Sequence, residues 1–288
     1  MTRRDLAGVI AVGLAFLVDG TKAQQPLGIE QLLDGQVTGL QTDQDLAAAQ
    51  DGSVVATWVN YSKPSNAEGF VRARRLSAVG KAGSTLRLWP TRLDLEVVVG
   101  TAPIPAERGF RIFWTKNLTT GNTVMAREFD DAGRPLNGER RISPTGGAFI
   151  TSAAARPSGG AWITALDGRC CDDQDRDAFA RGIDGSGKLT GPYRRVNTEA
   201  IPGLALGGPS SIGSRSNGGA VVAWGAIDEP FEGGEIRARL IGPQAGLLGS
   251  EIQVNTFTDH QQACPNLGVR PDDGFVVEWL SNQQDGPR

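Results

Sequence analysis

The residues best suited to chemistry gather in one acidic stretch, residues 167–177, which also contains two adjacent cysteines. Three of its carboxylates, Asp173, Asp175 and Asp177, alternate as Asp-x-Asp-x-Asp. A tight loop with this spacing can turn the three side chains toward one hard cation such as Ca²⁺, which prefers about six to eight oxygen ligands. Against this, Ala178 replaces the glycine that would ease the turn, and no glutamate follows at the EF-hand distance. We keep two interpretations, a solvated acidic loop and a calcium site; no other cofactor is predicted.

The chain has three cysteines, Cys170, Cys171 and Cys264. In an oxidising compartment three cysteines leave at least one thiol unpaired. Adjacent cysteines can close a strained ring, or one of them can pair with Cys264, and the sequence does not choose between these pairings. Because the Cys-x-x-Cys spacing of zinc sites is absent and the chain has one histidine, we do not expect structural zinc.

No catalytic residue is predicted with a specific role. The single histidine, His260, has no Gly-x-Ser-x-Gly elbow to support a catalytic triad, and phosphate-loop and dinucleotide fingerprints are absent. We therefore expect His260 to be a polar residue in a connection. Cleavage of a glycosidic bond needs two carboxylates about 5–10 Å apart. Acidic residues on the expected loops that could form such a pair are Glu68, Asp175, Asp228, Glu229 and Glu232.

Composition and charge describe an ordinary globular protein. Hydrophobic residues are 39% and charged residues 21% of the chain, so global disorder is not expected. The net charge is −3 and the arginines are scattered rather than gathered in a stripe. A nucleic-acid partner is therefore not expected, because such partners need a basic surface.

The N-terminus has the features of a secretion signal. Arg3 and Arg4 precede an uncharged apolar run over residues 6–18, and Ala23 ends a sequence that resembles a cleavage site. The run of 13 residues would make about 20 Å of helix, less than the roughly 30 Å of a bilayer core. We prefer a signal peptide over residues 1–23 to a membrane anchor or a buried helix. The mature protein would then be secreted, periplasmic or on the cell surface, without a membrane span.

A sequence motif is repeated along the rest of the chain: a glycine-rich turn, then an apolar strand that usually ends in tryptophan. The 39 glycines and 16 prolines supply the turns. The spacing between equivalent strand ends is 51–59 residues, in the range of repeat proteins. These end positions are Trp58, Trp114, Ala165, Trp224 and Trp279. We expect the tryptophans to be core residues between neighbouring units, with carbohydrate stacking as the alternative role.

Two further sequence motifs complete each repeat unit. A short alternating strand with a shared Ala-Arg follows the first four tryptophan strands, as in Ala73-Arg74 and Ala238-Arg239. A polar turn then leads to another strand, as in residues 184–187 before residues 194–197. With the strand before each glycine turn, this gives four strands in about 55 residues, which is typical of a propeller blade. The sequence predicts an all-β, β-propeller-like array of four complete units and a partial fifth.

The last two units resemble a known family. Residues 254–258, 273–279 and 284–286 follow a Val-Asn-Thr … Asp-Gly-Gly-Phe-Val-Val-x-Trp … Gln-Asp-Gly pattern. This is similar to the tandem propeller-like repeats of large secreted bacterial surface proteins. The match is close over residues 251–286 and looser over 46–250, and the third unit departs from it at Ala165. The resemblance implies a propeller-like fold and brings no activity with it.

The domain organisation leaves the closure of the ring open. We predict a signal peptide at 1–23, an N-terminal segment at 24–45 that could close the ring, and the repeat domain at 46–288. The last residue, Arg288, lies inside the fifth unit. An irregular five-bladed ring, an open arc and a truncated array are all compatible with this.

The functional hypotheses rest on the loops that join the strands of each unit. The loops between the second and third strands vary while the repeated strands stay similar, which favours recognition of a protein or carbohydrate ligand. Our main hypothesis is a secreted, non-catalytic binding or structural module. The alternatives are a propeller-type glycoside-active hydrolase and a degenerate fragment without a function of its own.

Overall fold

The structure is a computed structural model of the 288-residue chain. Within the described residues the regular structure is made of β-strands, and no helix occurs there. This confirms the prediction of an all-β protein. The structure describes residues 11–12, 31–32, 40–48, 51–61, 68–92, 96–104, 109–118, 121–144, 147–167, 177–198, 210–228 and 233–282.

The strands form antiparallel sheets that follow one another along the chain, and we number these sheets 1 to 5. Sheet 1 contains β3 (Leu40–Ala48), β4 (Val54–Tyr61), β5 (Glu68–Leu76) and β6 (Leu86–Arg92). Sheet 2 contains β7 (Glu96–Ile104), β8 (Gly109–Leu118), β9 (Gly121–Asp130) and β10 (Arg140–Arg141). Sheet 3 contains β11 (Ala148–Ala155), β12 (Ala161–Asp167), β13 (Ala178–Ile183) and β14 (Leu189–Arg195). Sheet 4 contains β15 (Ser211–Ser214), β16 (Ala220–Asp228), β17 (Gly233–Ile241) and β18 (Leu247–Gln253). Sheet 5 contains β19 (Gln262–Val269) and β20 (Phe275–Ser281).

A further small pairing lies near the N-terminus, where β1 (Ala11–Val12) pairs with β2 (Gln31–Leu32). The rest of the predicted signal peptide lies outside the described residues. Strand β3 begins at Leu40, so the first sheet starts inside the segment 24–45 that we set apart from the repeat domain.

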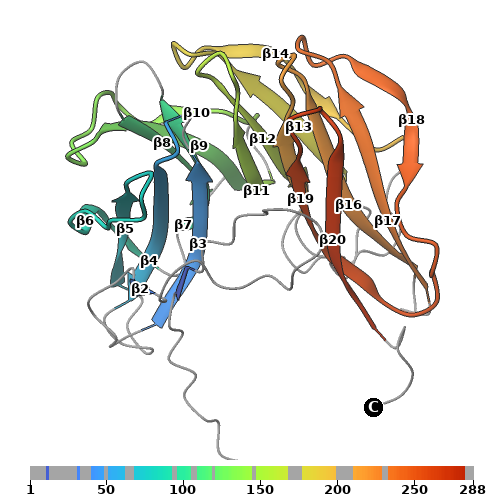
Figure 1. The fold of residues 1–288 in the computed structure, drawn as a ribbon, viewed down its shortest axis with the longest axis horizontal. Coiled ribbons are helices and arrows are strands. Elements are labelled where there is room, and N and C mark those ends of the chain that lie inside the picture. The colour runs from blue at the N-terminus through green and yellow to red at the C-terminus, as the bar shows by residue number, and fades with distance from the viewer. Residues whose placement is uncertain are drawn as a thin grey trace, which may run out of the picture.

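The sheets pack face to face around their first strands. Strand β3 contacts β7, β7 contacts β11, β11 contacts β15, and β15 contacts β19. Figure 1 shows this succession from the blue strands of sheet 1, through the green and yellow sheets, to the red strands of sheet 5. Each of sheets 1 to 4 is a simple meander, so its fourth strand, such as β14 or β18, lies farthest from these first strands.

The described turns that follow first and third strands share one conformation. In these turns the fourth residue has a positive φ, which glycine adopts without steric cost. Gly159 and Gly218 take this position after first strands, and Gly133 and Gly187 take it after third strands. The repeated glycines of the sequence are therefore explained by the backbone geometry of these turns. Two turns depart from the rule, with Ala245 (φ 62°) and Asp273 (φ 63°) at the same position.

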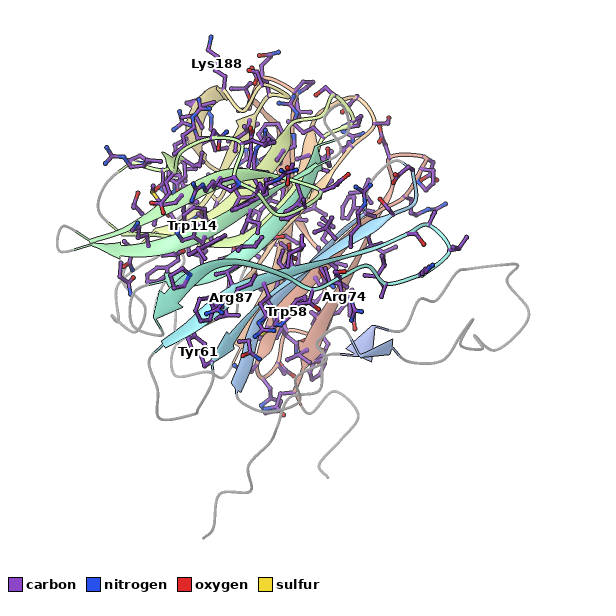
Figure 2. All side chains as sticks on the ribbon, turned by 90° about the vertical axis from the view of Figure 1, so that its left-hand side faces the viewer. Trp58, Tyr61, Arg74, Arg87, Trp114 and Lys188 are labelled. Atoms are coloured by element: carbon purple, nitrogen blue, oxygen red, sulfur yellow. The ribbon has the colours of Figure 1, made fainter. Side chains whose placement is uncertain are left out.

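Trp114 and Trp224 lie in apolar clusters between neighbouring sheets, whereas Trp58 lies in a cluster with Ala56 and Leu76 of its own sheet. Trp114 of sheet 2 packs with Val55 and Val71 of sheet 1, and Trp224 of sheet 4 packs in one cluster with residues of sheet 3. Trp58, Trp114 and Trp224 are almost completely buried. Figure 2 shows Trp58 and Trp114 among the strands, while Lys188 projects outward from its turn.

Sheet 3 achieves the same packing with a different residue. At the usual tryptophan position Ala165 faces sheet 2, where it lies in one cluster with Phe113. The tryptophan of this sheet, Trp162, lies on the opposite face and packs with Val222 and Trp224 of sheet 4. Because successive side chains of a strand point to opposite faces, a shift by an odd number of residues moves the indole to the other neighbour.

In sheets 2, 3 and 4 a side chain just after the fourth strand accepts a hydrogen bond from a backbone amide near the start of the third strand. The Oδ1 atom of Asn197 accepts a hydrogen bond from the Ala178 amide (2.9 Å), and that of Asn255 accepts one from the Ile236 amide (2.8 Å). In sheet 2 the hydroxyl of Ser143 accepts from the amide of Val124 (2.9 Å). The recurring Val-Asn is thus a structural element of the repeat. These side chains are buried, and buried polar groups need such partners.

Candidate functional site

The two ends of the sheets differ in a way that bears on function. We call the end with the first-to-second and third-to-fourth turns the turn side, and the opposite end the loop side. On the turn side the same hydrogen-bonding pattern recurs from sheet to sheet, as in Gly159 N to Arg156 O (2.9 Å) and Gly218 N to Arg215 O (3.0 Å). On the loop side the second and third strands are joined by loops of unequal length, namely 62–67, 119–120, 168–177 and 229–232.

Two of the acidic residues considered for glycoside chemistry lie at strand ends on the loop side. Glu68 is the first residue of β5, where its backbone is paired with Arg92, and Asp228 is the last residue of β16, where it is paired with Gly233. The other three, Asp175, Glu229 and Glu232, lie outside the described residues. The structure therefore fixes the side on which Glu68 and Asp228 lie and leaves the pairing of carboxylates as a prediction.

The acidic stretch is described only at its end. Asp177 Oδ1 accepts hydrogen bonds from Arg195 Nη2 (2.8 Å) and from Asn197 Nδ2 (2.9 Å). Among the described residues, no group of three or more His, Cys, Asp or Glu side chains is placed to hold a metal ion. Asp177 thus ties β14 to the start of β13, and the calcium interpretation remains a prediction. The rest of the stretch that we singled out, Cys170, Cys171, Asp173 and Asp175, lies outside the described residues.

The remaining cysteine and the single histidine are both exposed. Cys264 is unpaired within the described part of the chain and has a positive φ of 54° on β19. His260 also has a positive φ, 60°, in the connection between sheets 4 and 5. A disulfide that includes Cys264 stays a prediction, because both candidate partners lie in the undescribed loop.

Buried hydroxyl groups link sheets 3 and 4 on the loop side. The hydroxyl of Ser210, just before β15, lies 2.7 Å from that of Thr151 and 2.9 Å from that of Thr164. Thr164 also donates to the carbonyl oxygen of Phe179 (2.9 Å). These bonds fix the chain where it enters sheet 4.

Trp279 differs from the other tryptophans of the repeat. It lies near the loop-side end of β20 and is only partly buried, and its indole Nε1 donates a hydrogen bond to Gln262 Oε1 (2.9 Å). Gln262 itself is fully buried, and its Nε2 donates to the carbonyl oxygen of Asp259 (3.2 Å). The indole ring is therefore held in a fixed orientation with part of its surface open to solvent.

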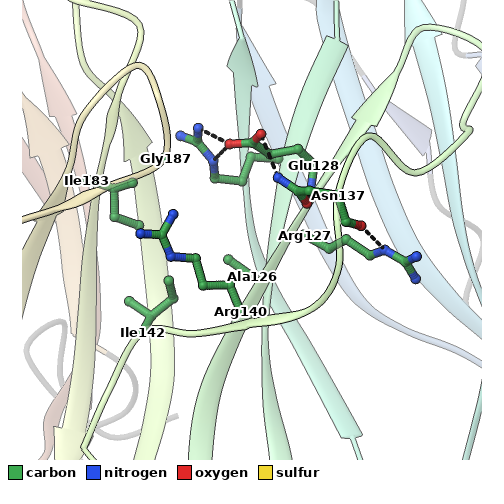
Figure 3. Close-up of a pocket in the computed structure, with 9 residues that line it drawn as sticks. Ala126, Arg127, Glu128, Asn137, Arg140, Ile142, Ile183 and Gly187 are labelled. Atoms are coloured by element: carbon green, nitrogen blue, oxygen red, sulfur yellow. Dashed lines mark hydrogen bonds and ion pairs between the residues drawn. The ribbon is translucent and has the colours of Figure 1, made fainter.

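A pocket lies between sheets 2 and 3, toward the turn side (Figure 3). It encloses roughly 230 Å³, including some open space at its mouth. Its polar lining consists of Arg111 of β8, Arg127 and Glu128 of β9, Asn137 just before β10, and Arg140 of β10, and Gly187 of the turn before β14 also borders it. The floor is apolar and includes Ile142 and Ile183.

Sequence reasoning missed this pocket, although one signal was present. Arg111 interrupts an otherwise apolar second strand, between Phe110 and Ile112. The structure buries its guanidinium group almost completely against Glu128. A charged residue inside an apolar strand marks either a buried ion pair or a site, but the sequence does not show which residue faces it.

No protein-family model matches the sequence, and no curated protein is significantly similar to it. Solved structures do resemble the fold. A protein of unknown function from Dyadobacter fermentans is 15% identical, with a TM-score of 0.59 over 92% of this chain and 78% of that one. An α-L-arabinanase from Penicillium chrysogenum, solved in complex with arabinobiose, is 14% identical, with a TM-score of 0.51 over 83% of this chain and 74% of that one.

A polysaccharide lyase of the ulvan lyase type is 9% identical, with a TM-score of 0.52. The match covers 84% of this chain and 61% of the lyase, which was also solved with bound -[GlcA(1-4)Rha3S]-. At such low identities these likenesses concern the fold alone. The arabinanase and the lyase are β-propellers, and the repeat domain of this chain is a β-propeller-like array as the sequence predicts.

In the described residues, no helix is long and apolar enough to cross a membrane.

Proposed function

We propose that this protein is a carbohydrate-active β-propeller that binds a polysaccharide on its loop side and cleaves its glycosidic bonds. The observation that supports this most is the likeness of more than four fifths of the chain to two propellers that act on polysaccharides, the arabinanase and the ulvan lyase. It favours our alternative hypothesis, a glycoside-active enzyme, over a purely structural module.

The loop side has features that suit such a role. Glu68 and Asp228 lie at strand ends there, and the acidic residues Glu229 and Glu232 follow in the loop after Asp228. Trp279 offers a fixed, partly exposed aromatic surface on the same side, and aromatic rings pack well against the apolar faces of sugars. We propose that the catalytic carboxylates come from these loops and that Trp279 stacks on a sugar ring.

The catalytic part is tested with the full chain on a panel of arabinans, uronate-containing and other polysaccharides. Release of reducing ends or of unsaturated products is measured. We expect activity on at least one substrate, and a loss of about 100-fold or more in Asp228→Asn or Glu229→Gln if that residue is a general acid or base. Glu278→Gln, an exposed carboxylate on β20, is the control. The absence of turnover on the whole panel would argue against an enzyme.

A second candidate function is a non-catalytic glycan-binding module, and Trp279 is the observation that favours it. A glycan array identifies the ligand, and titration then measures affinity. Trp279→Ala should weaken binding by about tenfold, because one aromatic stacking contact is lost. Leu280→Ala is the control, since Leu280 is 67% exposed on the opposite face of the same strand. Binding that is unchanged in Trp279→Ala would remove Trp279 from the site.

We also propose that the protein is secreted, periplasmic or bound to the cell surface, on the basis of residues 1–23. Mass determination of the N-terminus of protein recovered from culture medium or periplasm tests this. Cleavage after Ala23 or close to it is expected, whereas an intact N-terminus in the cytosolic fraction would contradict the proposal.

A further inference from the structure

The pocket between sheets 2 and 3 contains a buried arginine whose hydrogen-bonding capacity is only partly used. Arg111 is 1% exposed. Its Nε donates to Glu128 Oε1 (2.8 Å), and its Nη2 donates to the same oxygen. Its Nη1 is buried and has no hydrogen-bond partner among the described residues. Leaving a buried, charged N–H group unpaired is costly, so the position calls for an acceptor.

The carboxylate beside Arg111 is not free to supply that acceptor. Glu128 Oε1 receives the two bonds from Arg111, and Oε2 receives one from Asn137 Nδ2 (2.8 Å). Asn137 Oδ1 in turn accepts from the backbone amide of Glu128 (3.2 Å). Glu128 is therefore held in place, and the buried Nη1 atom of Arg111 remains without an acceptor among the described residues.

A second guanidinium group lies beside the first. Arg140, on β10, lines the same pocket, is exposed, and forms no hydrogen bond or ion pair with another described residue. Figure 3 shows its guanidinium group extending toward Gly187 and Ile183, whereas Arg127 points away to the carbonyl oxygen of Asn137.

The two cations converge on one small residue of sheet 3. A Cβ atom built on Gly187 would lie 2.8 Å from Glu128 Oε1, 3.3 Å from Arg140 Nη1 and 3.5 Å from Arg111 Nη2. Gly187 has a φ of 81°, so the turn itself also favours glycine here. The absence of a side chain leaves room in front of both guanidinium groups, which a larger residue would fill.

The charges around the pocket do not cancel. The lining arginines Arg111, Arg127 and Arg140 bring three positive charges, and Glu128 brings one negative charge. The excess of two positive charges, together with the unpartnered Nη1 group of Arg111, matches a group with several acceptor oxygens and a negative charge. Arginine recognises sulfate, phosphate and carboxylate oxygens through such parallel N–H donors.

We propose that this pocket is a binding site for a single oxyanionic group, a sulfate or a carboxylate, held between Arg111 Nη1 and the guanidinium of Arg140. The source of that group is either a free inorganic anion or an acidic sugar. The site lies toward the turn side and does not depend on the function proposed for the loop side.

The test is to titrate the full chain with sodium sulfate at constant ionic strength. Calorimetry measures the binding, and thermal unfolding measures the change in Tm. We expect saturable binding in the wild type and a rise in Tm beyond that given by sodium chloride. In Arg140→Gln the affinity should fall about tenfold, because one charge-assisted partner is lost. Arg140→Lys keeps the positive charge but loses the paired N–H donors of the guanidinium group. Its affinity for sulfate should lie between those of the wild type and Arg140→Gln.

Arg270→Gln is the matched control, since Arg270 is an exposed arginine of sheet 5 whose loss changes the net charge equally. An equal response to sulfate in Arg140→Gln and Arg270→Gln, or no saturable binding in the wild type, would overturn the proposal. Because Arg140 is exposed, its variants should fold, and Tm without sulfate verifies this.

Two further titrations identify the source of the anion. Glucuronate and glucose 6-sulfate are compared with acetate and inorganic sulfate, in the wild type and in Arg140→Gln. Tighter binding of the sugar anions that depends on Arg140 supports an acidic glycan, whereas tighter binding of the inorganic ion supports a free anion. Either outcome is consistent with the site, and neither depends on cleavage of a polysaccharide.

Discussion

The indole nitrogen of Trp162 donates a hydrogen bond of 3.0 Å to the carbonyl oxygen of Gly218, so the tryptophan of sheet 3 is fastened to the first turn of sheet 4. The guanidinium carbon of Arg156 lies 5.0 Å from the centre of the Trp162 ring, and Arg156 Nη2 donates to the carbonyl oxygen of Pro243 (3.2 Å). The contact between these two sheets is therefore specified by polar bonds as well as by apolar packing.

The hydrogen bond of Trp162 should be measurable by comparison with Trp114. Both indoles are buried, but Trp114 Nε1 has no partner among the described residues. We expect Trp162→Phe to lower the free energy of unfolding by about 1 kcal/mol more than Trp114→Phe, because only the first change removes a hydrogen bond. Chemical denaturation of both variants provides the measurement. Equal losses would show that the bond contributes nothing net.

The contacts of Asp273 with sheet 4 should make the free energy of unfolding depend on pH in the acidic range. Hydrogen bonds from the backbone amide of Ser216 (2.6 Å) and from its hydroxyl (2.8 Å) lower the pKa of Asp273, and the charge of Arg215 adds to this. A carboxyl with a lowered pKa contributes stability above its unfolded-state pKa of about 3.9 and loses that contribution as the pH falls through its folded-state pKa.

The stability difference between wild type and Asp273→Asn should therefore be largest near neutral pH. It should shrink as the pH falls from about 5 to about 2. Thermal unfolding over this range tests the expectation. Asp272→Asn, on the adjacent residue with no bond to sheet 4, should keep the pH dependence of the wild type. A stability difference between wild type and Asp273→Asn that stays constant over this pH range would contradict the prediction.

Asn255, just after the fourth strand of sheet 4, should tolerate serine better than alanine. Asn255 accepts from the Ile236 amide and donates to the carbonyl oxygens of Gly234 (2.9 Å) and Phe257 (2.8 Å). Serine keeps the acceptor, as Ser143 does in sheet 2. We expect Asn255→Ala to cost about 1–3 kcal/mol more than Asn255→Ser, because alanine leaves a buried amide unpaired. Urea denaturation gives the order, and a reversed order would refute this role.

The positive-φ position of the turns should respond to substitution according to what the side chain contacts. Ala245 has a φ of 62° and is almost completely buried. The substitution Ala245→Gly should relieve about 1 kcal/mol of backbone strain. It should also lose the burial of one methyl group, which contributes a stabilisation of similar size. We expect little net change. Gly218→Ala has space for its Cβ, with the nearest atom 3.6 Å away, and should cost about 1–2 kcal/mol from strain alone. Comparison of the two midpoints of denaturation tests this.

The sequence by itself determined the strands, their order and their turns. Alternating apolar residues, recurring glycines at positive-φ positions and the Val-Asn ending are local signals, because each reports the conformation of a few neighbouring residues. They were sufficient to predict four four-stranded units and a partial fifth, and the structure and its solved neighbours confirm the all-β, propeller-like architecture. The function of the loops is not a local property, and it stays at the level of a proposal.

Only the tertiary structure decided which face of each strand meets which sheet. In sheet 3 the end position is Ala165, and nothing in the local pattern shows that Trp162 replaces it on the opposite face and bonds to Gly218, a residue of the next unit. The same holds for Arg111, which meets Glu128 of its own sheet and Gly187 of the next. Contacts between units join residues about one repeat apart in sequence. They arise only when whole sheets pack together, so their partners cannot be read from a strand considered alone.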